Sequence, residues 1–445
     1  MECRTWLSGV AVVTGFRAVA SASLKPVDCS RALHEDPHVR PHLLCIGGED
    51  HALRIPFLLA LRAKGFRVSA AGSCDSTPFE QAGIDCHRFR LARFVDPLTD
   101  WTAFKAISRL IADLRPSVVQ CFDTKLNVLV PFAARDLGSV DVVSTINGLG
   151  WLYSSRSPLA LGLRPIYRAL QRLADHWTAV TVFQNRDDQA FFMRHRMVGR
   201  GGNVVIPGSG IDLGRFGHAA TTGPSHTGLR MALGLGASEV VVTVARLTRQ
   251  KGIPTLLDAA ALVHRRRPGV RFLLVGPREG EGPFAVTQAE IERHAPYVVA
   301  LGQRSDVPAL LGLADVFAFP TEYFEGVPRA LLEAAAAGRP IVATRMPGCT
   351  DVIRDGWNGF LVPPRDPQLM AERILNLLSD RETAATMGAR ASELVRAEFN
   401  LEITAARYAS VYESLMKRTI RKTSTRLDDE LERESFVQDA TRFGG

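Results

Sequence analysis

Residues 316–343 read VFAFPTEYFEGVPRALLEAAAAGRPIVA. The apolar run Val316–Phe319 is typical of a buried strand, and Ala330–Ala337 consists mostly of strong helix formers. Gly338 and Pro340 end this helix, and a second apolar run follows directly. A strand, a helix and another strand in this order form a unit whose two strands lie parallel in one sheet.

The same alternation recurs on both sides of this unit. Short apolar runs predict strands at residues 43–46, 66–71, 118–122, 140–145, 179–183 and 204–206, and again at 240–245, 272–275, 298–301, 316–319 and 341–343. Helical stretches separate them, which favours parallel sheets with helices on both faces. A polar, glycine-rich interval divides the two series near residues 207–228. We therefore predict an α/β fold of two Rossmann-like, doubly wound domains that face each other across a cleft.

The chain has 445 residues, enough for two or three domains. We predict five segments: a poorly ordered N-terminal extension (1–40), a first Rossmann-like domain (41–215), a second Rossmann-like domain (216–395), a C-terminal helix that packs back toward the N-terminal domain (396–415) and a charged tail (416–445).

The net charge of +8 is unevenly spread. Residues 1–215 carry 26 basic and 19 acidic side chains, whereas residues 216–445 carry 28 and 27. This asymmetry indicates an anionic partner for the N-terminal half, such as phospholipid, phosphate or nucleic acid. No aromatic–basic strand motif or recognition helix accompanies the charge, so we expect no nucleic acid partner.

The seven cysteines are scattered and contain no C-x-x-C pair, which argues against a zinc site or a disulfide framework. They indicate a reducing, cytoplasmic compartment. Residues 6–16 form an apolar run that could be read as a short signal peptide; we interpret it as part of the extension.

The loop before the alanine-rich helix carries the first candidate chemistry. If the helix begins near Gly326 and Val327, their free amides and the positive end of the helix dipole suit a phosphate. Glu325 and Glu333 are eight residues apart and could reach two parts of one extended ligand. The alternative is that both glutamates merely decorate the start and the surface of a helix.

Arg246 and Lys251 follow the predicted strand 240–245. They stand at the carboxyl end of a strand, where ligands of doubly wound sheets bind. Arginine can hold a phosphate through two hydrogen bonds and lysine supplies a point charge. The alternative is a pair of ordinary exposed cations.

Four motifs together resemble retaining GT-B glycosyltransferases of family 4. They are Ala245-Arg246 with Lys251-Gly252, Gly302-Gln303-Arg304-Ser305-Asp306-Val307, the Glu325 to Glu333 segment, and Gly356-Trp357-Asn358-Gly359-Phe360-Leu361-Val362-Pro363-Pro364. The resemblance extends from about residue 41 to residue 415 and is most specific in the C-terminal half. One departure is Gly348-Cys349-Thr350-Asp351, where the family often has Arg-Glu in the last two places.

The resemblance implies a nucleotide-sugar donor held mainly by the second domain. It places Arg246 and Lys251 at the donor diphosphate, with Gly326 and Val327 giving amides to the phosphate. Glu325 would bind hydroxyls of the transferred sugar, and Glu333 the ribose hydroxyls. Arg304 would lie near the base. No metal or other cofactor is required.

The N-terminal half is similar to the branch that acts on lipid-linked or surface-polysaccharide intermediates. Many family members have a histidine where this chain has Gln120-Cys121-Phe122-Asp123, so no catalytic histidine can be carried over. Asp123, Lys125 and Asn147 are the best polar candidates for the acceptor side. For Asp123 and Lys125, a solvent-exposed loop pair is an equally good interpretation.

Arg164, Arg168 and Arg172 recur every four residues on one face of a predicted helix, with no acidic residue from 154 to 174. Such a stripe suits an anionic bilayer surface or the diphosphate of a lipid acceptor. The alternative is a core-packed surface helix with a solvated arginine stripe.

The sequence thus predicts a retaining glycosyltransferase that moves a hexose or N-acetylhexosamine, from UDP by analogy, to a lipid-linked or polysaccharide acceptor. We place it in the cytoplasm, peripherally on the inner face of the cell membrane. Two alternatives remain. One is a non-hydrolysing sugar-nucleotide epimerase, and the other is an NAD-dependent oxidoreductase, prompted by the G-x-G-x-x-A match at residues 280–285.

Overall fold

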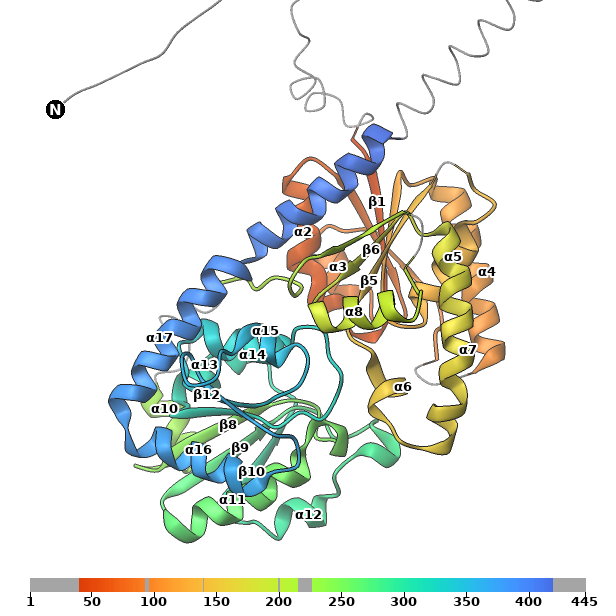
Figure 1. Ribbon diagram of the computed structural model, residues 1–445. Coiled ribbons are helices and arrows are strands. Elements are labelled where there is room, and N and C mark those ends of the chain that lie inside the picture. Colours follow the sequence, from red (N-terminus) through yellow and green to blue (C-terminus); the bar gives the residue numbers. More distant parts are fainter. Residues whose placement is uncertain (1–39, 93–95, 139, 199–200, 215–225, 419–445) are drawn as a thin grey trace, which may run out of the picture. The chain divides into compact units, whose positions relative to one another are not determined.

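The computed structural model describes residues 40–92, 96–138, 140–198, 201–214 and 226–418. Two parallel sheets lie in this part of the chain (Figure 1). We call residues 41–214 the first lobe and residues 226–400 the second lobe. The expected extension lies outside the described residues except for Arg40, and so does the expected tail beyond residue 418.

The first lobe is a seven-stranded sheet in the order β3-β2-β1-β4-β5-β6-β7. Its strands are β1 (His42–Gly47), β2 (Arg67–Gly72), β3 (Cys86–Arg88), β4 (Val118–Phe122), β5 (Asp141–Ile146), β6 (Val180–Phe183) and β7 (Asn203–Val205). Its helices are η1 (Glu49–Arg54), α2 (Ile55–Ala63), α3 (Thr77–Gln81), α4 (Pro97–Leu114), α5 (Leu126–Ala134), α6 (Gly150–Ser154), α7 (Pro158–Ala174), η2 (Asp175–Trp177) and α8 (Arg186–Arg194).

The second lobe is a six-stranded sheet in the order β10-β9-β8-β11-β12-β13. Its strands are β8 (Glu239–Val244), β9 (Val270–Val275), β10 (Val298–Gly302), β11 (Val316–Phe319), β12 (Ile341–Thr344) and β13 (Phe360–Val362). Its helices are α10 (His226–Ala232), η3 (Arg249–Lys251), α11 (Ile253–Arg266), η4 (Gly282–Phe284), α12 (Gln288–Glu292), α13 (Val307–Leu313), α14 (Arg329–Ala336), α15 (Cys349–Val352), α16 (Pro367–Ser379) and α17 (Arg381–Glu398).

Both sheets use the same doubly wound order, and their strand pairs are parallel. The order reverses between β1 and β4 in the first lobe and between β8 and β11 in the second. Ligands of such sheets bind beyond the carboxyl ends of the strands at this reversal. The predicted α/β fold with two Rossmann-like lobes is confirmed.

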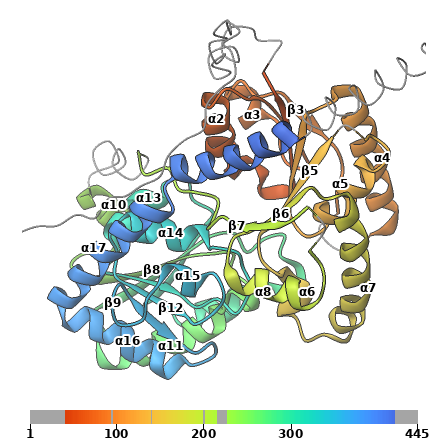
Figure 2. The same ribbon diagram turned by 45° about the horizontal axis from the view of Figure 1, so that its top comes forward.

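Alternation within the strands buries both faces of each sheet. In β1, Leu43 and Cys45 join a core with α2 and α3, whereas Leu44 and Ile46 join a core with α4 and α5. Figure 2 shows these two helical layers on opposite sides of the first sheet. In the second lobe, α14 packs on one face and α11 and α16 pack on the other.

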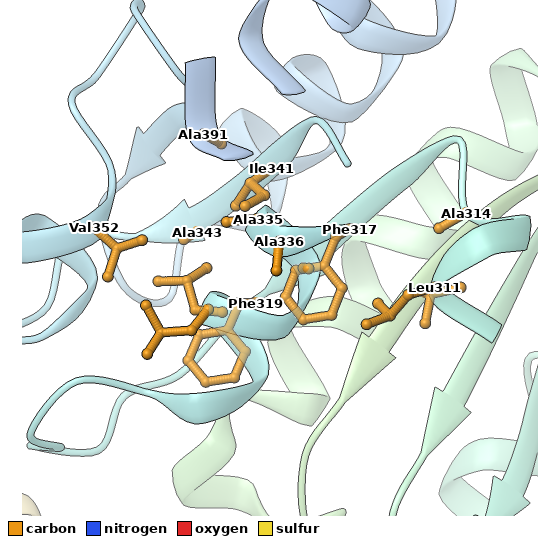
Figure 3. Close-up of a cluster of buried hydrophobic side chains, with 14 of the residues drawn as sticks. Leu311, Ala314, Phe317, Phe319, Ala335, Ala336, Ile341, Ala343, Val352 and Ala391 are labelled. Carbon is orange, nitrogen blue, oxygen red and sulfur yellow. The ribbon is translucent and has the colours of Figure 1, made fainter. Parts of the chain in front are cut away.

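Helix α14 packs on the second sheet through small side chains. Ala334, Ala335 and Ala336 are buried against the aromatic rings of β11 and the first residue of β12, Ile341 (Figure 3). Alanine lets the helix axis approach the sheet closely while keeping a high helix propensity. The loop that joins β11 to α14 is therefore held at both ends by buried elements.

The C-terminal helix predicted at 396–415 differs in its start. The helical conformation is interrupted after α17, because the Phe399 carbonyl accepts from Ile211 N and the Ile211 carbonyl accepts from Leu401 N. Residues 401–418 then form a separate helix. Its Tyr408 and Tyr412 lie in the first-lobe core, and Tyr412 donates to Gln120 Oε1 over 2.9 Å.

Two strands were missed from the sequence, β3 and β13. Both have only three residues and lie at an edge of their sheet, as the predicted β7 does. A run of three residues is too short for periodicity to identify a strand reliably. Among the described residues, no helix is both long enough and apolar enough to cross a bilayer.

A buried carboxyl in the first lobe makes stability depend on pH. Asp175 lies beneath α7, where burial raises the pKa of its carboxyl from 3.8 to about 7. Gln171 Nε2 donates to Asp175 Oδ1 over 3.1 Å, but Gln171 Oε1 and Asp175 Oδ2 are both buried without a hydrogen-bond partner. Two buried acceptor oxygens without donors favour the protonated form of the Asp175 carboxyl group.

The folded pKa is raised, so folding takes up a proton between about pH 4 and about pH 7, and stability falls as the pH rises through this window. We expect Asp175→Asn to raise the free energy of unfolding at about pH 8 by an amount on the order of 2 kcal/mol, because the amide carries no charge. The melting temperature measures this change. The advantage should shrink toward about pH 5. The exposed Asp113→Asn is the matched control; equal pH profiles for all three proteins would contradict the assignment.

Candidate active site

The predicted donor residues gather where the strand order of the second sheet reverses. Arg246 and Lys251 follow β8, Glu325 follows β11, and these two strands are parallel neighbours. Lys251 Nζ lies 2.7 Å from Glu325 Oε2, with only 11% of the lysine side chain and 16% of the glutamate side chain exposed. The structure thus joins two residues that are 74 positions apart into one buried ion pair.

Local backbone geometry brings Lys251 to this place. Thr248 Oγ1 accepts a hydrogen bond from Lys251 N and caps the start of the turn η3. Gly252 follows in the left-handed region with φ of 70° and lies directly against the Pro320 carbonyl, where a Cβ atom would clash. Only glycine meets both conditions. The loop after β8 can therefore pack against the loop after β11.

The carboxylate of Glu325 is fixed from both sides. Its Oε1 accepts from Thr321 Oγ1 over 2.9 Å while its Oε2 pairs with Lys251. Thr321 is itself buried, and its carbonyl accepts from Thr344 Oγ1. Carboxylate oxygens have more than one lone pair each, so Glu325 can still accept hydrogen bonds from ligand hydroxyls. Thr321 is a positioning residue that sequence reasoning missed.

Arg246 is anchored by a residue that was also missed. Its Nη1 lies 3.0 Å from Oε2 of Glu281, which is buried. Glu281 belongs to the G-x-G-x-x-A match, but this segment is a loop with the short turn η4, not the strand–loop–helix junction that cradles a dinucleotide pyrophosphate. The carboxylate orients the guanidinium and leaves about a third of the Arg246 side chain exposed.

Glu333 and Arg304 have partners of their own. Glu333 lies on α14, one turn from Arg329, whose Nε is 2.9 Å from Glu333 Oε1. Arg304 makes two hydrogen bonds to Asp306, of 2.8 and 2.6 Å. Within the described ranges, neither Glu333 nor Arg304 contacts the Lys251–Glu325 pair.

The expectation of free amides at Gly326 and Val327 is wrong for this structure. Helix α14 begins at Arg329 with Pro328 as its N-cap, so both residues precede the helix. Gly326 N donates to the Asn147 carbonyl over 2.9 Å, and Val327 N donates to Gln184 Oε1. Glu325 also precedes α14, whereas Glu333 lies on it.

These contacts belong to a clamp between the lobes. Phe324 N donates to Ser154 Oγ over 2.8 Å, the Phe324 carbonyl accepts from Gly150 N, and the Glu325 carbonyl accepts from Asn185 Nδ2. Gln184 and Asn185 follow β6, and their place at the carboxyl end of a strand could have identified them. We call residues 324–327 with these first-lobe partners the clamp.

The acceptor-side candidates occupy different positions. Asp123, with φ of 75°, follows β4 and accepts from Gly48 N over 2.8 Å. The Asn147 side-chain oxygen is buried without a hydrogen-bond partner, next to the clamp. Lys125 turns away to Asp100, at 2.7 Å, and to the Ala92 carbonyl. Asp123 and Asn147 thus lie at strand ends, whereas Lys125 holds the start of α4.

Arg54 was not proposed as a site residue. Its side chain is 11% exposed and lies over the Phe122 ring at 4.3 Å, and its Nη2 is 3.8 Å from Asp123 Oδ1. Its Nε is buried without a hydrogen-bond partner. Next to it, burial lowers the pKa of His51 to about 3, so this imidazole stays neutral. A weakly paired cation beside the Gly48 loop suits an anion.

Arg164 and Arg168 of the α7 stripe are turned inward, contrary to the membrane-facing interpretation, whereas Arg172 is exposed. Arg164 donates to the carbonyls of Leu152, Tyr153 and Ser155 at the end of α6. Arg168 donates to Tyr153 Oη, and Arg172 Nε donates to the His195 carbonyl. The stripe is structural because these carbonyls need donors that the short helix α6 cannot supply.

Two family descriptions match most of the two lobes. "Glycosyl transferase 4-like domain" matches residues 57–201, and "Glycosyl transferases group 1" matches residues 238–380. The second match contains Arg246, Lys251, Glu325 and Glu333.

Among curated proteins, the N,N'-diacetylbacillosaminyl-diphospho-undecaprenol alpha-1,3-N-acetylgalactosaminyltransferase of Campylobacter jejuni is 24% identical over 374 residues, which are 83% of this chain and 97% of that protein. The GDP-mannose-dependent alpha-(1-6)-phosphatidylinositol monomannoside mannosyltransferase of Mycobacterium tuberculosis is 28% identical over 297 residues, which are 64% of this chain and 72% of that protein. Among solved structures, Anabaena Alr3699/HepE in complex with UDP has a TM-score of 0.68 at 23% identity, over 84% of this chain and 100% of that one. This last likeness concerns the fold.

The clamp depends on the absence of a side chain at Gly148. Its φ is 103°, and a Cβ atom there would lie 2.5 Å from the carbonyl carbon of Glu325 and from Phe324 O. We expect Gly148→Ala to lower the free energy of unfolding by about 2 kcal/mol or more, through backbone strain and separation of the clamp. Thermal unfolding measures the change.

Gly269→Ala is the matched control, since a Cβ atom at residue 269 meets nothing within 4 Å. An unchanged melting temperature for Gly148→Ala would show that the Glu325 loop does not pack on residue 148.

Proposed function

We propose the following reaction for this chain, which belongs to the GT-B glycosyltransferases of family 4. It transfers a hexose or an N-acetylhexosamine, with retention of anomeric configuration, from a nucleotide-diphosphate sugar to a lipid-linked or polysaccharide acceptor. The observation that carries the proposal is the buried Lys251–Glu325 pair at the carboxyl ends of β8 and β11, with Arg246 on the same strand end. The pair offers one fixed cation and one fixed acceptor to a ligand that has both phosphates and hydroxyls.

Arg246 and Lys251 hold the donor diphosphate in this proposal. As the bond between the anomeric carbon and the phosphate oxygen breaks, negative charge grows on the diphosphate, and two cations already in place stabilise it without reorganisation. Glu281 and Glu325 orient these cations through ion pairs. Because both cations then share their charge with the donor, the intramolecular pairs should loosen when it binds.

Glu325 accepts hydrogen bonds from hydroxyls of the transferred sugar, and Glu333 accepts from the ribose hydroxyls. Arg304 lies in the loop after β10 that approaches the base. The amides of Gly326 and Val327 can reach a phosphate only after they leave Asn147 and Gln184, so their role requires opening of the clamp.

The acceptor hydroxyl attacks the anomeric carbon from the face that the diphosphate leaves, and its proton passes to a phosphate oxygen of the departing nucleotide. The new bond joins the anomeric carbon to the acceptor oxygen, and the nucleoside diphosphate is the second product. No nucleophile from the protein is needed. Asp123, Asn147 and Arg54 face the acceptor from the first lobe.

The acceptor class rests on the relatives. The Campylobacter enzyme is named for a diphospho-undecaprenol substrate and the mycobacterial enzyme for a phosphatidylinositol mannoside. Together with the basic first half of this chain, these names support a lipid-borne acceptor and a peripheral place on the cytoplasmic face of the membrane. For the donor we propose a UDP-sugar; the mycobacterial relative is named for GDP-mannose, so both nucleotides belong in the test.

Mass spectrometry of products after incubation with UDP- and GDP-sugars and a lipid-diphosphate acceptor tests the reaction. Turnover of the nucleotide-sugar without an acceptor would favour the epimerase alternative.

We expect Glu325→Gln to lower transfer by about a hundredfold, since the amide loses the ion pair with Lys251 and half of its acceptor capacity. Glu322→Gln is the matched control: Glu322 is three residues away and pairs with Arg365 instead. Comparable rates for both variants would remove Glu325 from the reaction.

We also expect transfer to persist in EDTA, because Arg246 and Lys251 supply the positive charge that a divalent cation supplies in metal-dependent transferases. A loss of transfer that added Mg²⁺ or Mn²⁺ restores would overturn this part of the proposal.

A further inference from the structure

Exposed apolar side chains of this protein gather on one lobe. The described residues include ten large exposed hydrophobic side chains, and most of them lie on three helices of the first lobe. They are Leu98 and Trp101 on α4, Leu159, Leu161, Ile166, Leu170 and Leu173 on α7, and Met193 on α8. Scattered apolar side chains on a surface are ordinary, but five on one helix are not.

Helix α7 presents its apolar face to solvent. At 100° per residue, seven residues share an arc of about 120°. They are Leu159, Gly162, Leu163, Ile166, Ala169, Leu170 and Leu173. Leu159, Ile166 and Leu173 are 64%, 54% and 46% exposed. We call this set the α7 apolar face.

Two of the three arginines opposite the α7 apolar face point into the protein. Arg164 and Arg168 are half-buried and donate to carbonyls and a hydroxyl of the α6 segment, whereas Arg172 is exposed and donates to the His195 carbonyl after α8. Helix α7 packs beside α5 in the layer that covers one face of the first sheet (Figure 1 and Figure 2). A surface helix of a water-soluble lobe has the reverse arrangement. This inversion matches a helix whose outer surroundings are not water.

We propose that the α7 apolar face inserts into the interface of an anionic phospholipid bilayer, a proposal that rests on the lipid-borne acceptor proposed above. Charge complementarity supports this occupant. Exposed arginines lie near both ends of the helix: Arg156 precedes it, Arg172 is in its last turn, and Arg194 and Arg196 lie beside that end, where Arg172 contacts His195. No acidic residue occurs from 154 to 174. Leucines bordered by arginines are the composition of interfacial helices.

The α7 apolar face is connected to the candidate active site by a short path. Helix α6 directly precedes α7, and Arg164 of α7 caps its carboxyl end. The same α6 contributes Gly150 and Ser154 to the clamp around the Glu325 loop. A bilayer bound at α7 would therefore place lipid headgroups near the loop that carries the sugar-binding carboxylate.

Apolar insertion and electrostatic attraction differ in their response to salt. Salt at about 1 M shortens the screening length to about 3 Å and weakens charge attraction, whereas apolar burial persists. We expect the chain to bind vesicles of phosphatidylethanolamine and phosphatidylglycerol at about 0.15 M salt and to keep a large part of that binding at about 1 M.

The test compares the full chain with the double variant Ile166→Glu/Leu170→Glu by co-sedimentation with these vesicles. Both side chains are exposed, so the fold should be unchanged, and thermal unfolding checks this. We expect vesicle affinity to fall at least about tenfold, since two apolar contacts are replaced by charges that anionic lipid repels. Met231→Glu, an exposed apolar position on α10 of the second lobe, is the matched control and should bind as the wild type does.

Undiminished vesicle binding by the double variant overturns the inference. The inference is also overturned if the wild type is a dimer, the double variant is a monomer and both bind vesicles equally. The α7 apolar face would then join two copies of the chain. Transfer to a short-chain, water-soluble acceptor separates the two proposals. Wild type and double variant should transfer to it equally, whereas only the double variant should lose transfer in vesicles. Vesicle binding through α7 without transfer to any acceptor would reject the proposed reaction and leave this inference standing.

Discussion

Parallel pairing of neighbouring strands forces each connection to cross the sheet, so helices must cover both of its faces and every strand ends at the same edge. Two strands that neighbour each other at the reversal of strand order then place their following loops together, whatever their separation in sequence. Lys251 and Glu325 meet for this reason, although β8 and β11 are separated by two other strands in the chain. In the first lobe the same constraint brings Gly48, after β1, to Asp123, after β4.

The charged residues at this edge are paired within the protein. The pairs are Arg246 with Glu281, Lys251 with Glu325, Arg304 with Asp306 and Arg329 with Glu333. A half-buried cation without a counterion is costly, so an internal carboxylate stabilises each of them. The same contacts fix the side-chain rotamers in advance, which lowers the entropy lost when the ligand binds. The same ion pairs therefore neutralise the cations and fix their side chains in place.

Sequence periodicity was sufficient for the strands of both sheets except β3 and β13, and the family resemblance grouped Arg246, Lys251 and Glu325. It could not identify Glu281 or Thr321, because their roles arise from contacts between loops that fold against each other. It also could not show that the Gly326 and Val327 amides are occupied, because their acceptors, Asn147 and Gln184, belong to the other lobe. Contacts between segments distant in sequence leave no local pattern.

Helix α7 shows a second limit of periodicity. The sequence established that its arginines share one face and its apolar residues another, but periodicity does not say which face packs inward. The carbonyls at the end of α6 decide the matter, since they need donors and Arg164 supplies them. Once Arg164 and Arg168 turn inward, the leucines on the opposite face turn outward. The charge of the first half then acts at long range, through exposed arginines that orient the lobe toward an anionic surface, and the leucines act only on contact. Long-range charge attraction and short-range apolar contact thus act on the same helix. The apolar contact can stabilise only an orientation that the charge attraction has already selected.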